Sequence, residues 1–555
     1  TQPDGASLTN EFYPTGLLKK QSGARTYPVQ YTYDTAGRLQ TMTTWQNQAS
    51  ATGAALTTWN YDPQRGWLTA KRYADNTGPD YTYTPAGRLA SRLWARGNPR
   101  LTTTYTYNNA GDLQSVHYSD ASPDLAYTYD RQGRQTELVQ GGHITRRWLD
   151  SAGNLLGESY TGGPLAGLRI TNQYDPFLRR TNLAVVNSQG AVLTATAYGY
   201  DAASRLSQVT SGTASATYSY LANSPLVGQI GFTNNGAWRM TTTKSYDYLN
   251  RLTEISSVPS GDAPVRFAYD YNLANQRTVR READGSYWRY EYDVLGQVRS
   301  GKKYWSDGTP VAGQQFEYRF DDIGNRVGTK AGGDDGGTGL RAASYSANAL
   351  NQYTSRQVPG AVDVMGIALA TNPVTVNGQG VYRKGEYFRK ELSVNNAAGP
   401  VWQQVDVTAP NETTVTRHEL VPKTPETFTY DADGNLVQDG LWTYTWDGEN
   451  RLIRVESRPV TPQGSWRRVE WQYDALGRRI RQTTWDGSSG TWQVTEDLTF
   501  VSDPVLFGRH VAELNASNNA LVHAYAWGLD LSGSLQGAGG VGGLLSVTVH
   551  TGPNT

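Results

Sequence analysis

Short polar and aromatic segments alternate with turn residues along the chain. In the segment Tyr31-Thr32-Tyr33 the tyrosines lie two positions apart, so both rings point to one side of a strand and the threonine to the other. Asp34 suits the first position of a type I turn, where its carboxylate accepts an amide proton two residues on, and Gly37 suits the left-handed residue that follows. Arg38-Leu39 returns the chain, so the pattern predicts a β-hairpin with an aromatic face.

This unit recurs for most of the chain, with early turns at positions 34, 62, 84, 108, 130 and 150. An isolated hairpin is marginally stable, so each unit must stack on its neighbours. Because a long open sheet twists and curls, we expect an all-β spiral of hairpins around a hollow interior. The positions expected to have a structural role in the repeat are Tyr33, Asp34, Gly37, Arg38, Tyr129, Asp130, Gly133, Tyr246, Asp247, Tyr292, Asp293, Gly296, Tyr430, Asp431, Gly434, Tyr473, Asp474 and Gly477.

One segment breaks this rhythm. No aromatic-Asp-x-x-Gly unit occurs within 356–426, where short strand patterns alternate with turn residues, which predicts a small inserted β-sandwich. We therefore expect a first wall region over 1–355, the sandwich over 356–426, a second wall region over 427–530 and a Gly-rich tail over 531–555.

Composition narrows the function. Fifty Lys and Arg balance fifty Asp and Glu, so no electrostatic argument favours a nucleic-acid partner. The chain has no cysteine, which excludes disulfides and thiolate chemistry, and no apolar stretch long enough for a membrane span, so we expect no membrane insertion. The first residues lack an initiator Met and a signal segment, which predicts a processed or excised piece of a larger protein.

The repeated unit Tyr33-Asp34-x-x-Gly37-Arg38-Leu39 resembles the YD repeats of the Rhs family, which includes bacterial polymorphic toxins, shell components of insecticidal ABC toxin complexes and animal teneurins. The resemblance covers roughly 27–353 and 427–530. It implies a large hollow β-shell that encloses a C-terminal cargo in toxin members. The self-cleaving C-terminal core of such relatives is expected to be absent from this chain, and the sandwich is similar to Ig-like modules at fold level only.

No residue pattern points to catalysis. None of the six histidines lies in a His-Glu-x-x-His arrangement, and no Gly-x-Ser-x-Gly elbow occurs. The run Asp431-Ala432-Asp433-Gly434-Asn435 superficially suggests a calcium loop, but its spacing is wrong and we interpret it as a repeat turn. We therefore expect no catalytic, cofactor-binding or metal-binding residue, no cofactor and no enzyme activity.

Our first hypothesis is a non-enzymatic bacterial β-shell, secreted or at the cell surface, that encapsulates cargo or serves as an extracellular scaffold. The candidate partners are a C-terminal toxin cargo, further shell segments, a carbohydrate or a cell-surface protein. The alternative is a teneurin-like adhesion or assembly protein that binds carbohydrate or protein through its outer wall or its sandwich. A third, weaker hypothesis, an enzyme, would need acid, base or metal groups that converge in a cleft.

Overall fold

The structure is a computed structural model that describes residues 1–550, in which every regular element is a β-strand except the short 3-10 helix η1 (Gln463–Ser465). Thirty strands precede the predicted insertion. The first fifteen are β1 (Leu8–Phe12), β2 (Leu18–Gly23), β3 (Val29–Tyr33), β4 (Leu39–Asn47), β5 (Thr52–Tyr61), β6 (Leu68–Arg72), β7 (Asp80–Tyr83), β8 (Leu89–Gly97), β9 (Arg100–Tyr107), β10 (Leu113–Tyr118), β11 (Leu125–Tyr129), β12 (Gln135–Gln140), β13 (His143–Leu149), β14 (Leu155–Thr161) and β15 (Arg169–Tyr174). The next fifteen are β16 (Arg180–Val186), β17 (Val192–Tyr200), β18 (Leu206–Ser211), β19 (Ala214–Tyr220), β20 (Val227–Asn234), β21 (Ala237–Tyr246), β22 (Leu252–Pro259), β23 (Val265–Tyr271), β24 (Arg277–Glu282), β25 (Tyr287–Tyr292), β26 (Val298–Tyr304), β27 (Pro310–Phe320), β28 (Arg326–Gly332), β29 (Leu340–Ala347) and β30 (Tyr353–Arg356).

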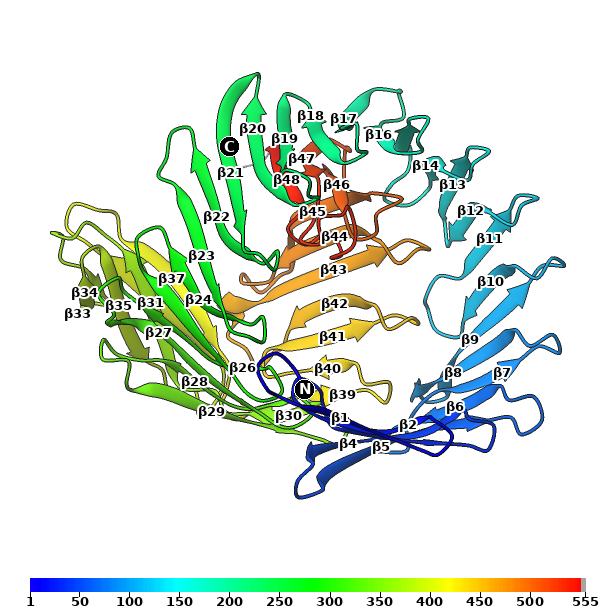
Figure 1. The fold of residues 1–555 in the computed structure, drawn as a ribbon, viewed down its shortest axis with the longest axis horizontal. Coiled ribbons are helices and arrows are strands. Elements are labelled where there is room, and N and C mark those ends of the chain that lie inside the picture. The colour runs from blue at the N-terminus through cyan, green and yellow to red at the C-terminus, as the bar shows by residue number, and fades with distance from the viewer. Residues whose placement is uncertain (551–555) are drawn as a thin grey trace.

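These strands form one antiparallel meander, because each pairs with the strand before it and the strand after it, from β1–β2 to β29–β30. The meander therefore has two edges. The turn edge carries the aspartate turns that follow odd-numbered strands, and the loop edge carries the connections that follow even-numbered strands. The sheet curves around the perimeter of the molecule and leaves an open middle (Figure 1).

The insertion interrupts one strand connection of this wall. β30 pairs with β38 (Glu426–Thr427) through Ser355 opposite Thr427 and Arg356 opposite Glu426. Between them lie β31 (Ala361–Ile367), β32 (Thr375–Val376), β33 (Gln379–Gly380), β34 (Tyr382–Lys384), β35 (Tyr387–Ser393), β36 (Val401–Thr408) and β37 (Val415–Val421).

The inserted strands form two small sheets, in the orders β31-β35-β34 and β33-β32-β36-β37, around a core that includes Val376, Phe388 and Val405. The insertion lies at one side of the wall (Figure 1). It is fixed there by polar contacts such as the one from the Tyr387 hydroxyl to the Ala312 carbonyl, 2.6 Å, and by Arg341 of β29, which pairs with carboxylates of β31 and β35.

A second strip continues after the insertion and crosses the middle of the ring that the first strands make (Figure 1). Its strands pair in chain order, from β39 to β48. They are β39 (Thr429–Tyr430), β40 (Leu436–Gln438), β41 (Trp442–Trp446), β42 (Leu452–Ser457), β43 (Arg467–Tyr473), β44 (Arg479–Asp486), β45 (Gln493–Ser502), β46 (His510–Asn515), β47 (Leu521–Trp527) and β48 (Leu544–Val549).

The largest hydrophobic core lies where this strip packs against the wall. Buried side chains from β14 to β20, such as Ile170 and Val209, join Val501 and Leu514 of the second strip in one cluster. Apolar burial contributes about 25 cal/mol per Å². Because this cluster is the largest in the described residues, it is the main apolar attachment of the second strip to the wall.

The structure confirms an all-β fold of stacked hairpins with an inserted sandwich, and the open curved sheet fits a spiral shell. The predicted Gly-rich tail over 531–555 includes a strand. Leu544–Val549 is strand β48, paired with β47, because its aliphatic and hydroxyl side chains suit a strand. The last five residues of that range, 551–555, lie outside the described residues.

Candidate functional site

Each aspartate turn is held by hydrogen bonds to its own backbone. Asp34 Oδ1 accepts protons from the Ala36 amide, 2.9 Å, and the Arg38 amide, 3.0 Å, while Oδ2 accepts one from Arg38 Nε, 2.7 Å. Gly37 has φ +78°, the left-handed conformation that favours glycine. The side-chain bond from Arg38, followed by the backbone bonds, lowers the pKa of the Asp34 carboxyl. The turn is thus a closed polar unit.

Where a tyrosine precedes the turn, it connects its hairpin to the previous one. Its ring leans across the sheet, and its hydroxyl donates a hydrogen bond to a backbone carbonyl near the start of the strand that follows the preceding turn. The donor and acceptor pairs include Tyr33 with Leu18, Tyr129 with Leu113, Tyr200 with Arg180, Tyr246 with Val227, Tyr292 with Arg277 and Tyr473 with Leu452.

Where an arginine follows the turn, it connects its hairpin to the next one. Arg38 lies over the Tyr61 ring at 4.6 Å, and Arg205 lies over Tyr220 at 4.2 Å. Arg134 Nη1 also donates to the Asp150 carbonyl of the following turn, 2.8 Å. A cation over an aromatic face contributes about 0.5–1 kcal/mol at an exposed site. A repeat that has both residues is therefore coupled to the hairpin before it and to the hairpin after it.

The predicted repeat positions all lie at such turns, but they do not all make the same bonds. Arg478 donates to Asp474 Oδ2 at 2.6 Å, whereas at Asp431 and Asp293 an amide side chain replaces the guanidinium as donor. These residues stand in separate hairpins along the turn edge, so the structure brings them together as a row and not as one pocket.

The turn edge of the second pass meets the loop edge of the first. The Arg25 amide, in the loop after β2, donates to the Val294 carbonyl in the turn after β25, 3.0 Å. In the loop after β4, the Gln48 amide donates to Asp322 Oδ2 in the turn after β27, 2.8 Å, although 274 residues separate the two. The offset between contacting connections is the same, which is how one turn of a spiral rests on another. We call this line of contacts the seam.

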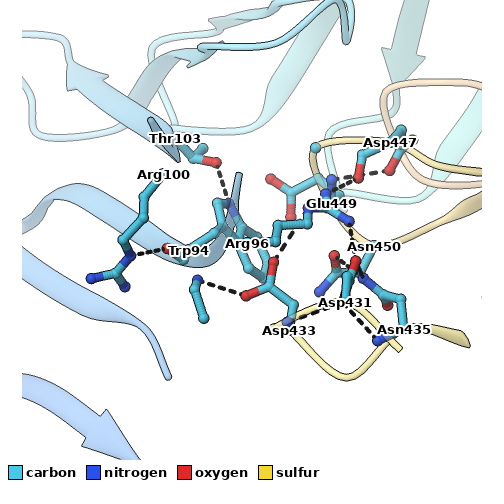
Figure 2. A network of polar contacts seen from close by, with 12 residues as sticks. Trp94, Arg96, Arg100, Thr103, Asp431, Asp433, Asn435, Asp447, Glu449 and Asn450 are labelled. Atoms are coloured by element: carbon cyan, nitrogen blue, oxygen red, sulfur yellow. Dashed lines mark hydrogen bonds and ion pairs between the residues drawn. The ribbon is translucent and has the colours of Figure 1, made fainter. Parts of the chain in front are cut away.

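The densest part of the seam surrounds Arg96, at the end of β8 (Figure 2). Its Nε lies 3.3 Å from Asp433 Oδ2 and its Nη1 lies 3.6 Å from Asp431 Oδ2, while Nη2 donates to the Asp447 carbonyl. The neighbouring Ala95 amide donates to Asp433 Oδ1, 2.7 Å. One buried guanidinium thus binds two consecutive turns of the second strip.

The strand that carries Arg96 is itself held firmly. Trp94 Nε1 donates to Thr103 Oγ1, 2.9 Å, and Arg100 Nε donates to the Trp94 carbonyl, 2.6 Å (Figure 2). Arg92 lies over the Trp94 ring at 3.4 Å. These contacts fix the rotamer of Trp94 and the direction of the strand end, so that the Arg96 guanidinium points toward the second strip.

Burial dominates the electrostatics at this point. Desolvation raises the pKa of the Asp433 carboxyl despite the opposing effects of the Ala95 amide and of Arg96. Desolvation, helped by the Glu449 carboxylate, also raises the pKa of Tyr118, whose ring lies beside the turn after β41. The site therefore holds charged groups at a cost that only correct docking of the two passes offsets.

Two further buried ion pairs join the second strip to the wall. Arg180 meets Asp503 at 2.7 Å and Arg478 meets Glu158 at 2.9 Å, and all four side chains are nearly inaccessible to solvent. The sequence pattern predicted the turn that contains Arg478. It did not predict a role for Arg96, Arg180 or Glu158, or which residues form ion pairs. Their only signal is a charged residue in an otherwise strand-like run, and nothing in the sequence identifies the partner.

The histidines do not gather into a site. His143 lies near the Gly162 carbonyl, and His523 pairs with Glu513 at 2.8 Å. Over residues 1–550, no three His, Cys, Asp or Glu side chains come close enough together to hold a metal ion. In the same range, no helix has the length and apolar character needed to cross a bilayer.

Comparison with known proteins adds distant relatives. No family model matches the chain. "Probable deoxyribonuclease RhsB" of Dickeya dadantii is 26% identical over 253 residues, which is 43% of this chain and 14% of that protein. "tRNA nuclease WapA" of Bacillus subtilis is 34% identical over 70 residues, 12% of this chain and 3% of that protein. The crystal structure of TcdB2-TccC3-Cdc42 matches 95% of this chain and 30% of its own chain, at 11% identity and a TM-score of 0.47.

The geometry defines a class of protein: a curved antiparallel wall of aspartate-turn hairpins, each coupled to its neighbours and closed along a polar seam. The repeated unit resembles the YD repeat of the Rhs family, and over 43% and 46% of its length the chain is similar to the RhsB and RhsA proteins of Dickeya dadantii. The chain spans about one seventh of the length of those two relatives.

Proposed function

We propose that this chain is a length of shell wall that isolates a polypeptide cargo from its surroundings, and that the wall itself carries out no reaction. The observation that supports this most is the seam. Buried charges such as Arg96 bind one pass of the spiral to the next, so the wall resists opening between its turns. A container needs that property, whereas an open scaffold does not.

The nuclease names belong to whole relatives, of which this chain covers a small part. We assign any such activity in the full-length protein to a cargo segment and not to the wall. The same proposal places the shell in a bacterial secreted or cell-surface protein, with cargo and further shell segments as its partners.

The test uses the full-length protein with its natural cargo segment. Limited proteolysis of the intact protein is expected to leave the cargo segment uncut, and Arg96→Met combined with Arg180→Met is expected to make it accessible. The exposed pair Arg281–Asp270 provides a matched control, because Arg281→Met removes an ion pair away from the seam. Cleavage of the cargo at the same rate in all three proteins would refute enclosure.

A second function, adhesion or assembly, is favoured by one feature of the insertion. Its two sheets do not close at one end, and aliphatic side chains such as Ile367 and Leu369 are largely exposed there. Loss of binding to a target cell or protein on blocking this surface, with the cargo still protected, would support the adhesion function independently of enclosure.

A further inference from the structure

The two sheets of the inserted sandwich have unequal numbers of strands and leave two free edges on the same side. One sheet has three strands and ends at β31, and the other has four and ends at β37. Within residues 1–550, β31 pairs only with β35 and β37 pairs only with β36. A row of backbone amides and carbonyls along each edge is therefore without a strand partner, which proteins usually cover or charge.

The gap between the two edges is a wedge that is closed at one end. There the Val358 amide donates to Thr424 Oγ1, 3.1 Å, and Asn396 Nδ2 donates to the Val358 and Pro422 carbonyls at 3.2 and 2.8 Å. At the other end the sheets separate around a cavity of about 520 Å³. Its apolar lining includes Val364, Ile367, Leu369, Val405, Val407 and Val415.

The register shows that the wedge is an uncovered part of the sandwich interior. Val407 lies opposite Val415, and Val405 lies opposite Arg417, so all four side chains project from the same face of their sheet. Val405 belongs to the buried core, whereas Val415 and Arg417 on the edge strand are exposed. The opposing sheet is one strand too narrow to cover them.

We propose that this wedge binds an extended segment of a partner polypeptide, which adds a strand at the free edge and inserts alternate apolar side chains between the sheets. The inference rests on the insertion being a binding module, the second function above, and not on cargo enclosure. Main-chain hydrogen bonds to an edge supply affinity in this mode of recognition, and pockets for alternate side chains supply selectivity.

The chemistry of the wedge favours a peptide strand over a glycan. Sugar-binding surfaces commonly offer exposed aromatic platforms, but the wedge is aliphatic and its one aromatic residue, Phe388, is buried. Trp402 and His418 lie on the opposite face of this sheet, where their rings stack on each other with centroids 5.1 Å apart. Arg417 donates only to the Thr416 carbonyl and makes no ion pair in the described residues, so the strand should carry a carboxylate beside its apolar positions.

The experiment uses the full chain and fluorescent peptides of the length of β31, 7 residues, with alternating valine and threonine and one glutamate. Fluorescence anisotropy is expected to show saturable binding. Val415→Asp is expected to weaken it by about tenfold or more, since it places a charge where an apolar side chain would be buried. Leu273→Asp is the control, because Leu273 of the wall is also an exposed aliphatic side chain, 71% against 49% for Val415.

A second measurement separates strand pairing from general apolar adhesion. A peptide with the same side chains but N-methylated at alternate residues lacks the edge-pairing amide protons, and its binding is expected to be lost. Hydrogen exchange is expected to slow in β31 or β37 when the unmodified peptide is added. Equal binding of both peptides, equal loss with Leu273→Asp, or no saturable binding of any such peptide would overturn the proposal. Protection of cargo from proteolysis is a separate readout, so failure here leaves the enclosure proposal unaffected.

Discussion

Arg180 and Asp503 form a bidentate ion pair, with Nη1 and Nη2 2.8 and 2.7 Å from the two carboxylate oxygens, although 323 residues separate them along the chain. Burial works against the charge of Arg180, but Asp503 outweighs it and raises the pKa of the guanidinium. The pair joins the start of β16 to the turn after β45, and so fixes the second strip on the wall.

Removal of one partner of this ion pair should destabilise the contact between the second strip and the wall. Asp503→Asn keeps an acceptor for the Val505 and Leu506 amides but leaves the buried guanidinium without a carboxylate, so we expect a loss of about 3–5 kcal/mol in the free energy of local opening. The measurement is native-state hydrogen exchange of the β45 and β16 amides. Arg180→Met with Asp503→Asn should recover most of the loss, whereas a double variant as unstable as the single one would contradict the prediction.

The tyrosine hydroxyls should each contribute a small, measurable amount. Tyr200→Phe removes the hydrogen bond to the Arg180 carbonyl, 2.9 Å, and should destabilise the hairpin by about 0.5–1.5 kcal/mol. Tyr248→Phe is the control, because that side chain is fully exposed at a turn tip. Urea unfolding curves of the two variants would show the difference, and equal midpoints would refute the role of the hydroxyl.

The Arg96 seam should be pH-dependent. The pKa of Asp433 is raised, so its folded form holds the proton more tightly than the unfolded chain and its charge costs stability as pH rises. Arg96→Met removes the cation that offsets this charge. We therefore expect the variant's loss of thermal stability to grow as the pH rises above 3.8, the ordinary pKa of an aspartate.

Arg266→Met is the control for that experiment, because its ion pair with Glu254 lies at the surface, where solvent screens it. A stability loss for Arg96→Met that stays constant with pH would show that Asp433 does not titrate with the seam.

The repeat aspartates should act in the opposite direction. Bonding from Arg179 lowers the pKa of Asp175 below its ordinary 3.8, so the charged carboxylate stabilises the fold above that value and the benefit is lost as pH falls through the folded pKa. Asp175→Asn keeps a turn acceptor, as Asn108 does in its own repeat, where Oδ1 accepts from the Asp112 amide at 2.9 Å. The variant should lose less stability on acidification than the natural chain, measured by thermal unfolding across the acid range. A steeper acid loss in the variant would contradict the sign.

Local pattern was enough to predict the hairpins and their curved stacking. Tyr33 and Asp34 predict a strand and a turn within a few residues. The absence of that unit within 356–426 predicted the sandwich. The seam could not be predicted in this way, because Arg96 and Asp433 meet only after one full turn of the spiral. The pitch of that turn depends on strand twist summed over many hairpins, and the sequence contains no local signal of it.

Strand β48 was not predicted, for a related reason. Glycine enrichment over 531–543 indicated a Gly-rich tail, and the chain after that segment returns to β47 and adds β48. A strand of six residues is too short to be distinguished by pattern alone from the irregular segment before it.

The junction between β30 and β38 has a broader consequence. Arg356 and Glu426 lie opposite each other in the paired strands, and their side chains form an ion pair. The pairing that continues the wall therefore does not depend on what the intervening residues fold into. Such a socket would let evolution, or a protein engineer, exchange one appended module for another while the vessel beneath keeps its form.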